Sequence, residues 1–235
     1  MYWFDSRVRY SETDEQGRLS LTGILNYLQD CSTFQSEDLG IGIQYLTEHN
    51  RAWWVTSWQI IIDRYPCLGE PIRISTWPYD FKGIYGYRNF AIQDSKGVYL
   101  VRANSIWFFY DTEHQRPVRP EQADIEGYGK TEKRLEMDYA PRRIVLPEEY
   151  KEGEGIVVGR HHLDTNHHVN NAQYVEITKE LLPENILVRE VRAEYKKAAV
   201  LGDYMIPRIT KAGDGYVTAL CDNQGAVYAA VMLRE

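Results

Sequence analysis

The sequence predicts an α+β fold made of two copies of one unit, each a helix followed by antiparallel strands. Two observations carry this prediction. Landmark residues recur in the same order along the chain, and an apolar helical stripe precedes segments rich in β-branched and aromatic residues. An internal repeat outranks local patterns because it determines the whole architecture. With 235 residues the chain is long enough for two small domains.

Three landmarks define the repeat. The first is an aspartate between a strand-like segment and a helix, Asp14 in the first copy and Asp164 in the second. The second is a Gly-acid turn that begins a strand, at residues 69–70 and 202–203, and the third is a four-residue hairpin turn, at 94–97 and 222–225. The offsets of 150, 133 and 128 residues decrease along the chain, so the second copy is the more compact one. The alternative is an unrelated α+β protein whose turns agree by chance.

Each copy is expected to begin with a helix. In the first copy, apolar side chains recur at the i, i+3, i+4 and i+7 spacing of one helical face, at Leu21, Ile24, Leu25 and Leu28. Ser20 or Thr22 can cap that helix. In the second copy, Asn170 or Asn171 can cap a helix that runs to about Leu182, where Pro183 closes it.

Strands follow both predicted helices. They are expected at 54–62, 72–77, 87–93 and 98–110 in the first copy, and at 191–199, 204–210, 216–220 and 226–233 in the second. A long apolar helix wrapped by a curved antiparallel sheet is the hot-dog unit. We therefore expect a double hot-dog, with an N-terminal unit over 1–112, a linker over 113–148 that is rich in proline and charge, and a C-terminal unit over 149–235.

Composition excludes several classes of protein. The net charge of −7 argues against a general nucleic-acid binder, and no apolar run approaches the roughly 18–20 residues that span a bilayer. The N-terminal residues lack the pattern of a signal peptide. Cys31, Cys67 and Cys221 form neither a CxxC pair nor an obvious disulfide framework. We expect a cytoplasmic protein that neither inserts into membranes nor binds nucleic acid.

The segment 160–174 concentrates four of the six histidines, and three interpretations compete for it. It can be a polar strand-to-helix turn with exposed histidines. It can be a metal site, built from His161, His162, His167, His168 and Asp164. It can be a catalytic cluster, because Asp164, Asn166 and His168 occupy alternate positions next to a helix N-terminus, which favours negative charge. The histidine spacing matches no common zinc pattern, so we expect no metal and no other cofactor.

Comparison of the two copies favours the catalytic interpretation. Where the second copy has Asp164, Asn166 and His168, the first has Asp14, Gln16 and Arg18. The second copy also has Glu194, at the position that corresponds to Ile61. A structural role common to both copies predicts similar residues. We therefore expect the second copy to be catalytic and the first to bind substrate.

The motif Leu-Asp-x-Asn-x-His-Val-Asn-Asn-x-x-Tyr over 163–174, followed by Val-Arg-Ala-Glu-Tyr-Lys-Lys over 191–197, resembles the acyl-acyl carrier protein thioesterases of plant plastids and bacteria. The resemblance extends to residues 82–90 and 105–111 and so covers nearly the whole chain. It implies hydrolysis of fatty acyl thioesters on acyl carrier protein, which releases free fatty acid and holo-acyl carrier protein. The catalytic set that it implies is Asp164, Asn166, His168 and Glu194.

One departure from that family bears on mechanism. Plant members carry a cysteine shortly after the Glu-Tyr pair, whereas this chain has Lys-Lys-Ala-Ala over 196–199. We therefore expect no cysteine nucleophile. Thioester hydrolysis needs an activated water and a stabilised oxyanion. We expect Glu194 and His168 to deprotonate the water, Asn166 to orient it or the carbonyl, and backbone N–H groups of 169–171 to hold the oxyanion. Asp164 would orient its neighbours or act as a nucleophile through an anhydride.

Two further sets of residues follow from this expectation. An acyl chain needs an apolar tunnel, for which the candidates are Ile24, Leu25, Leu28, Trp54, Trp58 and Ile60, with core packing as the alternative role. An acidic carrier protein needs basic residues, for which the candidates are Arg142, Arg143, Lys196 and Lys197, with a solvated surface as the alternative.

Three other functions remain open on sequence alone. The nearest is an acyl-coenzyme A thioesterase of the hot-dog superfamily. A dehydratase or hydratase and a non-catalytic acyl-binding module are the others. Acyl chain length, branching and unsaturation are not determined by the sequence, and neither is the oligomeric state, for which a homodimer is one option.

Overall fold

The computed structural model describes residues 1–183 and 186–235. The chain divides into two compact units. The first comprises Met1–Thr56 and Ile62–Tyr139, and the second comprises Ser57–Ile61 and Ala140–Glu235. The boundary at Tyr139 falls inside the segment expected to be the linker, so part of that segment belongs to each unit.

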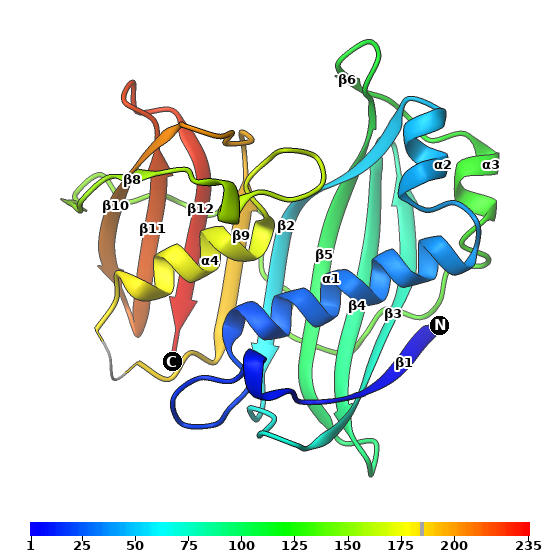
Figure 1. Ribbon diagram of the computed structural model, residues 1–235, viewed down its shortest axis with the longest axis horizontal. Helices are drawn as coiled ribbons and strands as arrows, with labels where there is room; N and C mark the ends of the chain where they lie inside the picture. Colours follow the sequence, from blue (N-terminus) through cyan, green and yellow to red (C-terminus); the bar gives the residue numbers. More distant parts are fainter. Residues whose placement is uncertain (184–185) are drawn as a thin grey trace. The chain divides into compact units, whose positions relative to one another are not determined.

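The first unit is a helix packed on an antiparallel sheet (Figure 1). Its strands are β1 (Tyr2–Arg7), β2 (Arg51–Ile62), β3 (Pro71–Lys82), β4 (Tyr85–Asp94), β5 (Tyr99–Asp111) and β6 (Arg116–Pro117). They lie in the order β1-β3-β4-β5-β2, and β6 pairs with β5. Its helices are η1 (Tyr10–Glu12), α1 (Leu21–Asp38), α2 (Ile43–Glu48) and α3 (Gln122–Glu126). The long helix α1 crosses one face of β3, β4 and β5.

The helix α1 has the N-terminal cap and the apolar face that the sequence predicts. Ser20 caps its N-terminus, because Ser20 Oγ accepts a hydrogen bond from the N–H of Gly23 at 3.0 Å. The predicted apolar face is buried against the sheet, at Leu21, Ile24, Leu25 and Leu28. The helix continues ten residues beyond Leu28, and its buried face there carries Cys31, Ser32 and Gln35.

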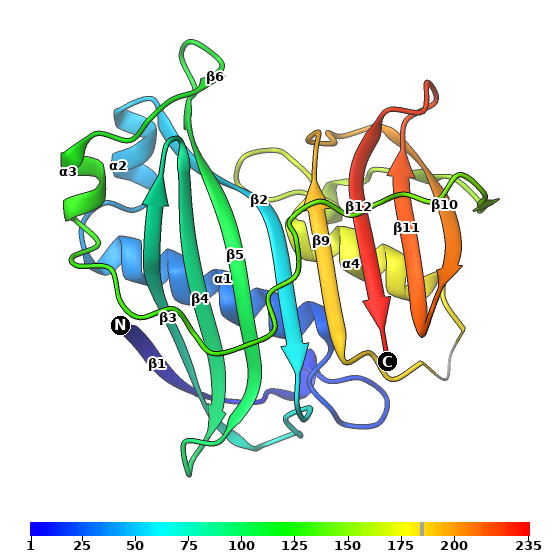
Figure 2. The same cartoon turned by 180° about the vertical axis from the view of Figure 1, so that it is seen from behind.

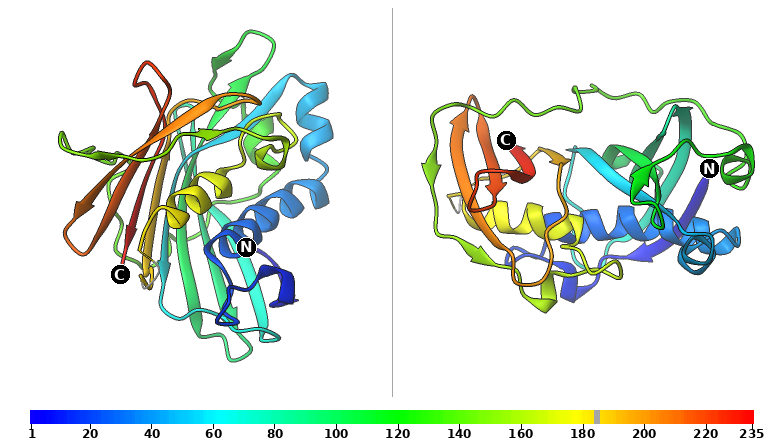
Figure 3. Two further views of the ribbon diagram at one scale, coloured as in Figure 1. Left: turned by 60° about the vertical axis from the view of Figure 1, so that its left-hand side comes forward. Right: turned by 90° about the horizontal axis from the view of Figure 1, so that it is seen from above.

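The second unit repeats this plan with shorter elements. Its strands are β7 (Lys151–Glu152), β8 (Ile156–Val157), β9 (Glu190–Tyr195), β10 (Tyr204–Ala212), β11 (Gly215–Cys221) and β12 (Val227–Arg234). Residues 57–61 of β2 pair with β9, and the order continues β9-β12-β11-β10-β7. The helices are η2 (Arg160–His162) and α4 (Asn171–Glu180), and α4 packs on the strands of its own unit (Figure 3). Strand β9 ends at Tyr195, four residues before the predicted end.

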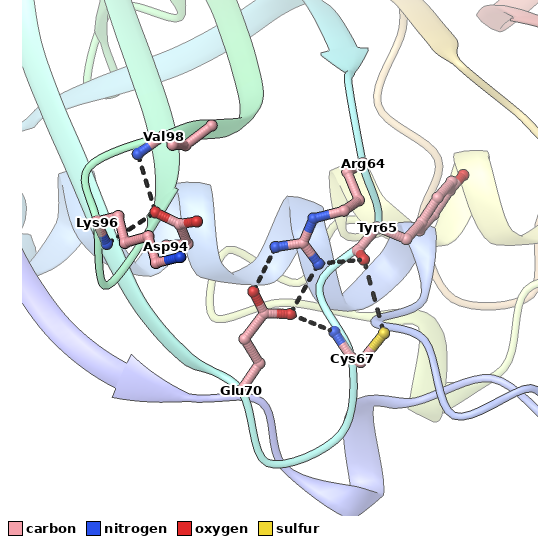
Figure 4. Close-up of polar contacts among 7 residues, drawn as sticks. All are labelled: Arg64, Tyr65, Cys67, Glu70, Asp94, Lys96 and Val98. Atoms are coloured by element: carbon pink, nitrogen blue, oxygen red, sulfur yellow. Dashed lines mark hydrogen bonds and ion pairs between the residues drawn. The ribbon is translucent and has the colours of Figure 1, made fainter.

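The Gly-acid turns of the two copies have the same local structure. Glu70 Oε2 accepts a hydrogen bond from the N–H of Cys67 at 2.9 Å, as Figure 4 shows. Asp203 Oδ2 accepts one from the N–H of Val200 at 3.0 Å. The glycines of both turns are left-handed, with φ of 78° and 85°, a region that favours glycine. The second landmark of the repeat is confirmed.

The hairpin turns agree as closely. Asp94 Oδ1 accepts hydrogen bonds from the N–H groups two and four residues later, both at 2.9 Å (Figure 4). Asp222 Oδ1 does the same in the second copy, again at 2.9 Å for both bonds. An aspartate that bonds its own following backbone folds such a turn locally. The third landmark of the repeat is also confirmed.

The segment expected to be a linker is bound to strand side chains. In the first unit, Trp77 Nε1 donates to the carbonyl of Lys133 at 2.9 Å, and the N–H of Leu135 donates to Asn89 Oδ1 at 3.0 Å. In the second unit, the N–H of Ala140 donates to Gln59 Oε1 at 2.8 Å. Figure 2 shows this segment running over the strand faces opposite the helix of each unit. It therefore covers sheet surface in addition to joining the two copies.

Candidate active site

The segment 163–170 forms a tight loop before α4. Leu163 and Val169 form an antiparallel bridge, and the N–H of Asp164 donates to the carbonyl of His168 at 2.8 Å. Asp164 Oδ1 accepts hydrogen bonds from the N–H of Asn166 at 2.8 Å and of His168 at 3.3 Å. The Asp164 side chain therefore organises the loop that carries the other two predicted catalytic residues.

The loop is anchored on both sides within the second unit. His168 forms a bridge with Val200, and the N–H of Val169 donates to the carbonyl of Ala199 at 2.9 Å. The N–H of Asn170 donates to the carbonyl of His162 at 2.8 Å. Asn170 Oδ1 caps α4 by accepting from the N–H of Ala172 at 2.9 Å, as predicted. Asp164, Asn166 and His168 are thus held together at a helix N-terminus, where negative charge is favoured.

The corresponding loop of the first unit has the same backbone. Asp14 Oδ1 accepts from the N–H of Gln16 at 3.0 Å and of Arg18 at 2.8 Å, and the N–H of Asp14 donates to the carbonyl of Arg18 at 2.7 Å. In this copy Arg18 Nε forms an ion pair with Asp14 Oδ2 at 3.0 Å. The aspartate therefore has the same structural role in both copies. Of the predicted catalytic residues in this loop, Asn166 and His168 are the two that differ from the first copy, which has Gln16 and Arg18.

One position of the loop separates the copies further. Gly17 has φ of 72° in the first loop, and its counterpart His167 has φ of 61° in the second. A residue with a Cβ atom is destabilised there by about 1–2 kcal/mol relative to glycine. His167 is exposed, so packing does not explain the side chain. The sequence places His167 only in the alternative metal site, whereas its positive φ marks it as a position where a side chain is retained at a cost in stability.

His162 has a structural role. It is 9% exposed, and its Nδ1 accepts a hydrogen bond from the N–H of Gly159 at 3.0 Å. Burial and the neighbouring His161, whose ring centroid lies 3.9 Å away, lower the pKa of His162 below its usual value. Within the described residues no group of three or more His, Cys, Asp or Glu side chains is arranged to hold a metal ion.

Glu194 lies on the sheet face that α4 does not cover. Tyr195 Oη donates to the carbonyl of Asn171 at 3.0 Å, so Tyr195 points toward α4. Successive residues of a strand point to opposite faces. Glu194 Oε2 instead accepts from the N–H of Ile144 at 3.0 Å and forms an ion pair with Lys196 at 3.6 Å. These two contacts of Glu194 are made with Ile144 and Lys196, and its expected partnership with His168 stays a prediction.

The expected oxyanion site must also be corrected. The N–H groups of Val169 and Asn170 are already bonded to the carbonyls of Ala199 and His162. They cannot also stabilise an oxyanion without breaking those bonds. The N–H of Asn171, the first residue of α4, has no acceptor within its helix, because the first N–H groups of a helix lack one. Of the three predicted donors, Asn171 is the one that the geometry leaves available.

The predicted tunnel residues are mostly buried. Ile24, Leu25, Leu28, Trp58 and Ile60 are each at most 2% exposed, and Trp54 is half-buried and stacked on Tyr110 at 4.0 Å. Core packing and a tunnel lining both require burial, so burial does not distinguish the two roles. The predicted docking residues Arg142, Arg143, Lys196 and Lys197 are all exposed. Lys197 forms an ion pair with Asp222 at 2.9 Å.

Two family descriptions match the chain in sequence. The acyl-ACP thioesterase N-terminal domain matches residues 2–128, and the acyl-ACP thioesterase C-terminal domain matches residues 147–226. A chloroplastic palmitoyl-acyl carrier protein thioesterase of Gossypium hirsutum is 25% identical over 193 residues, which are 77% of this chain and 46% of that protein. A chloroplastic dodecanoyl-[acyl-carrier-protein] hydrolase of Umbellularia californica is 23% identical over 92% of this chain and 61% of its own length. The chain thus spans about half the length of the curated relatives it matches.

Solved structures share the fold. An acyl-ACP thioesterase from Bacteroides thetaiotaomicron superposes with a TM-score of 0.88 and 22% identity, over 99% of this chain and 96% of that one. The 12:0-ACP thioesterase from Umbellularia californica gives 0.87 and 19%, over 99% and 96%. The predicted α+β double hot-dog fold is confirmed. No helix in the described ranges is long and apolar enough to cross a membrane.

Proposed function

Because the chain belongs to the acyl-acyl carrier protein thioesterase family, we propose that it hydrolyses fatty acyl thioesters of acyl carrier protein. One observation supports this proposal above the others. The two loops share a backbone, and only the loop of the second unit carries an imidazole, His168, beside its aspartate and amide, where the first loop has Arg18. The first unit is then free to bind the acyl chain. We place the reaction in the cytoplasm, in line with three free cysteines.

The proposed step begins with His168, which takes a proton from a water molecule. The water oxygen attacks the thioester carbonyl carbon, and Asn166 orients the water or the carbonyl. The N–H of Asn171 stabilises the oxyanion at the N-terminus of α4. The carbon–sulfur bond then breaks, the thiolate of the carrier takes the proton from His168, and free fatty acid and holo-acyl carrier protein leave.

Glu194 has no part in this step as we write it. Its carboxylate binds the backbone of Ile144 on the other sheet face. A catalytic role for Glu194 stays a prediction from the sequence, which the contacts of its side chain do not support. A nucleophilic Asp164 stays a separate prediction. Single-turnover hydrolysis in oxygen-18 water tests it, since an anhydride leaves label in the carboxylate.

The test is release of free thiol from one acyl chain presented on two carriers, acyl carrier protein and coenzyme A. We expect higher kcat/KM on acyl carrier protein. Preference for coenzyme A would replace the proposal with the acyl-coenzyme A alternative, and no thiol release from either would indicate a binding module. We also propose docking of the carrier on Arg142, Arg143, Lys196 and Lys197. Charge reversal at Arg142 and Arg143 should then raise KM for the carrier-bound substrate only.

A further inference from the structure

The inner face of α1 changes from apolar to polar along its length. Its first half buries Leu21, Ile24, Leu25 and Leu28, and its second half buries Cys31, Ser32 and Gln35. Helices in globular proteins bury an apolar stripe. The residues that the polar half contacts should therefore explain why it is polar.

It faces a buried arginine. Arg88 of β4 is 8% exposed, and its Nη1 donates to Gln35 Oε1 at 2.5 Å and to Thr76 Oγ1 at 3.0 Å. The guanidinium carbon lies 5.2 Å from the centre of the Tyr128 ring. The Tyr128 hydroxyl is in turn 3.1 Å from Ser36 Oγ on α1. Arg88 thus lies among neutral polar groups of α1, β3 and the segment after α3.

The charge of Arg88 has no counter-ion in the described part of the chain, where no carboxylate forms an ion pair with it. Buried charges are almost always paired, because burial removes their hydration. Burial lowers the pKa of Arg88, which reflects the same cost. A purely structural role would be served as well by an uncharged residue.

Among the residues that the structure describes, one edge of the guanidinium has no acceptor. Arginine has five N–H donors, and the hydrogen bonds of Arg88 to described side chains both leave from Nη1. The edge formed by Nε and Nη2 is one that binds a carboxylate with two parallel hydrogen bonds. The partner of this edge is therefore expected to be an acceptor oxygen from outside the described part of the protein.

We propose that Arg88, with Gln35 and Thr76, forms a binding subsite for an acyl chain that carries an acceptor oxygen, above all a carboxylate, away from its thioester end. This inference rests on the proposed function, in which the first unit binds the acyl chain. The apolar half of α1 would contact the methylene groups, and the polar half would receive the oxygenated group.

The experiment compares two thioesters on acyl carrier protein that have the same chain length, one ending in a methyl group and one in a carboxylate. We expect the wild-type protein to prefer the carboxylate-ended chain in kcat/KM by about 10-fold or more, since a charge-assisted hydrogen bond is of that strength. In Arg88→Met the preference should vanish or reverse. Arg88→Lys, which keeps the charge and loses the planar fork, should retain only part of it.

Arg102→Met is the matched control. Arg102 lies on the neighbouring strand β5 and is paired with Asp63 at 2.7 Å, and its loss should leave the preference unchanged. Thermal unfolding checks the fold of every variant. Arg88→Met removes an uncompensated buried charge and also leaves the buried Gln35 Oε1 without its donor, so Tm should stay close to that of wild type. Equal turnover of both substrates by wild type, or an unchanged preference in Arg88→Met, would overturn the proposal.

A binding measurement separates this proposal from the proposed function. The monomethyl ester of a dicarboxylic acid and the methyl ester of a monocarboxylic acid of equal length are compared by the rise in Tm that each causes. The first should raise Tm more in wild type, and the difference should disappear in Arg88→Met. This result would support the subsite even in a protein that hydrolysed neither thioester. A rise that is equal for both esters would refute it.

Discussion

Two loops of this molecule, residues 14–20 and 164–170, make the same backbone hydrogen bonds and carry different side chains. In each, an aspartate accepts hydrogen bonds from the N–H groups two and four residues later. In the first loop the aspartate also forms an ion pair with Arg18. The second loop has His168 at the position of Arg18. The comparison teaches that the aspartate maintains the loop. We expect catalytic activity to depend on the residues that differ between the two copies.

The largest effect is expected at the imidazole. His168→Ala should lower kcat by about 10²–10⁴-fold, the usual contribution of a general base. Arg18→Ala, at the equivalent position of the first loop, should leave kcat close to wild type because we propose no catalytic role for that copy. Steady-state kinetics on acyl carrier protein substrates measures both. A His168→Ala enzyme with near-normal kcat would remove His168 from the mechanism.

Substitution of either aspartate should lower the stability of the protein by a similar amount, but only one substitution should affect its activity. Asp14→Ala and Asp164→Ala each remove an acceptor of two backbone N–H groups and should each cost about 1–2 kcal/mol in the free energy of unfolding. Only Asp164→Ala should also abolish turnover. Asp164→Asn keeps the Oδ1 acceptor, so chemical denaturation should show restored stability. Full activity in Asp164→Asn would exclude a nucleophilic carboxylate.

Glu194 should act on stability more than on rate. Glu194→Ala leaves the buried N–H of Ile144 without its acceptor, which should cost about 1–3 kcal/mol in unfolding free energy. Its kcat should remain within a few-fold of wild type. Glu190→Ala, on the same face of β9, is the control for removing a carboxylate there. A large loss of kcat in a Glu194→Ala enzyme of normal stability would restore the catalytic role predicted from the sequence.

The smallest effect is a difference in pH dependence. His162 and Glu12 occupy equivalent positions, and each accepts a hydrogen bond from the N–H three residues earlier. The pKa of His162 is lowered in the folded protein, so the unfolded chain binds the proton more readily. Its stabilising contribution is complete above the ordinary histidine pKa of 6.5 and is lost as the pH falls through the lowered value.

His162→Gln keeps an acceptor for Gly159 and does not titrate. Denaturation at a series of pH values should show that this variant loses less stability than wild type as the pH falls below 6.5. For Glu12, burial raises the pKa, but hydrogen bonds from Arg9 and Tyr27 outweigh it and lower the pKa overall. Its contribution is therefore complete above the ordinary glutamate pKa of 4.5 and is lost as the pH falls through the lowered value. Equal slopes for wild type and His162→Gln would contradict the assignment.

The repeat could be predicted from the sequence because its turns depend on residues with strong local preferences. The glycines at 69 and 202 adopt positive φ, and Asp94 and Asp222 each bond their own following backbone. These preferences act within a few residues, so a single sequence displays them. The apolar stripe of α1 could be predicted for the same reason, because its residues are spaced within two turns of one helix.

The remainder of the site depends on which face a strand presents, and a motif does not contain that information. The prediction for Glu194 rests on the family motif that residues 191–197 resemble and on its repeat position opposite Ile61. The alternation of side chains along β9 indicates the face on which Glu194 lies. Val191 and Ala193 form the buried face toward α4, and Glu194 belongs to the opposite face of the strand. The sequence does not show that the N–H groups of Val169 and Asn170 are bonded to the carbonyls of Ala199 and His162, because these bonds depend on the folded loop. Arg88 was overlooked because its burial depends on α1.

The shared backbone of the two loops also has a consequence for protein engineering. The main chain of the first loop already has the conformation of the candidate active-site loop, so it could carry the same side chains in the same arrangement. Gln16→Asn and Arg18→His would install there the two side chains that distinguish the second loop, beside an aspartate that is already present. The exchange removes the ion pair of Arg18 with Asp14, its hydrogen bond to Gln16 and its contact with the Tyr65 ring. Partly exposed interactions of this kind contribute little to stability. A designer could thus move reactive side chains between the halves of a duplicated protein without remodelling its backbone.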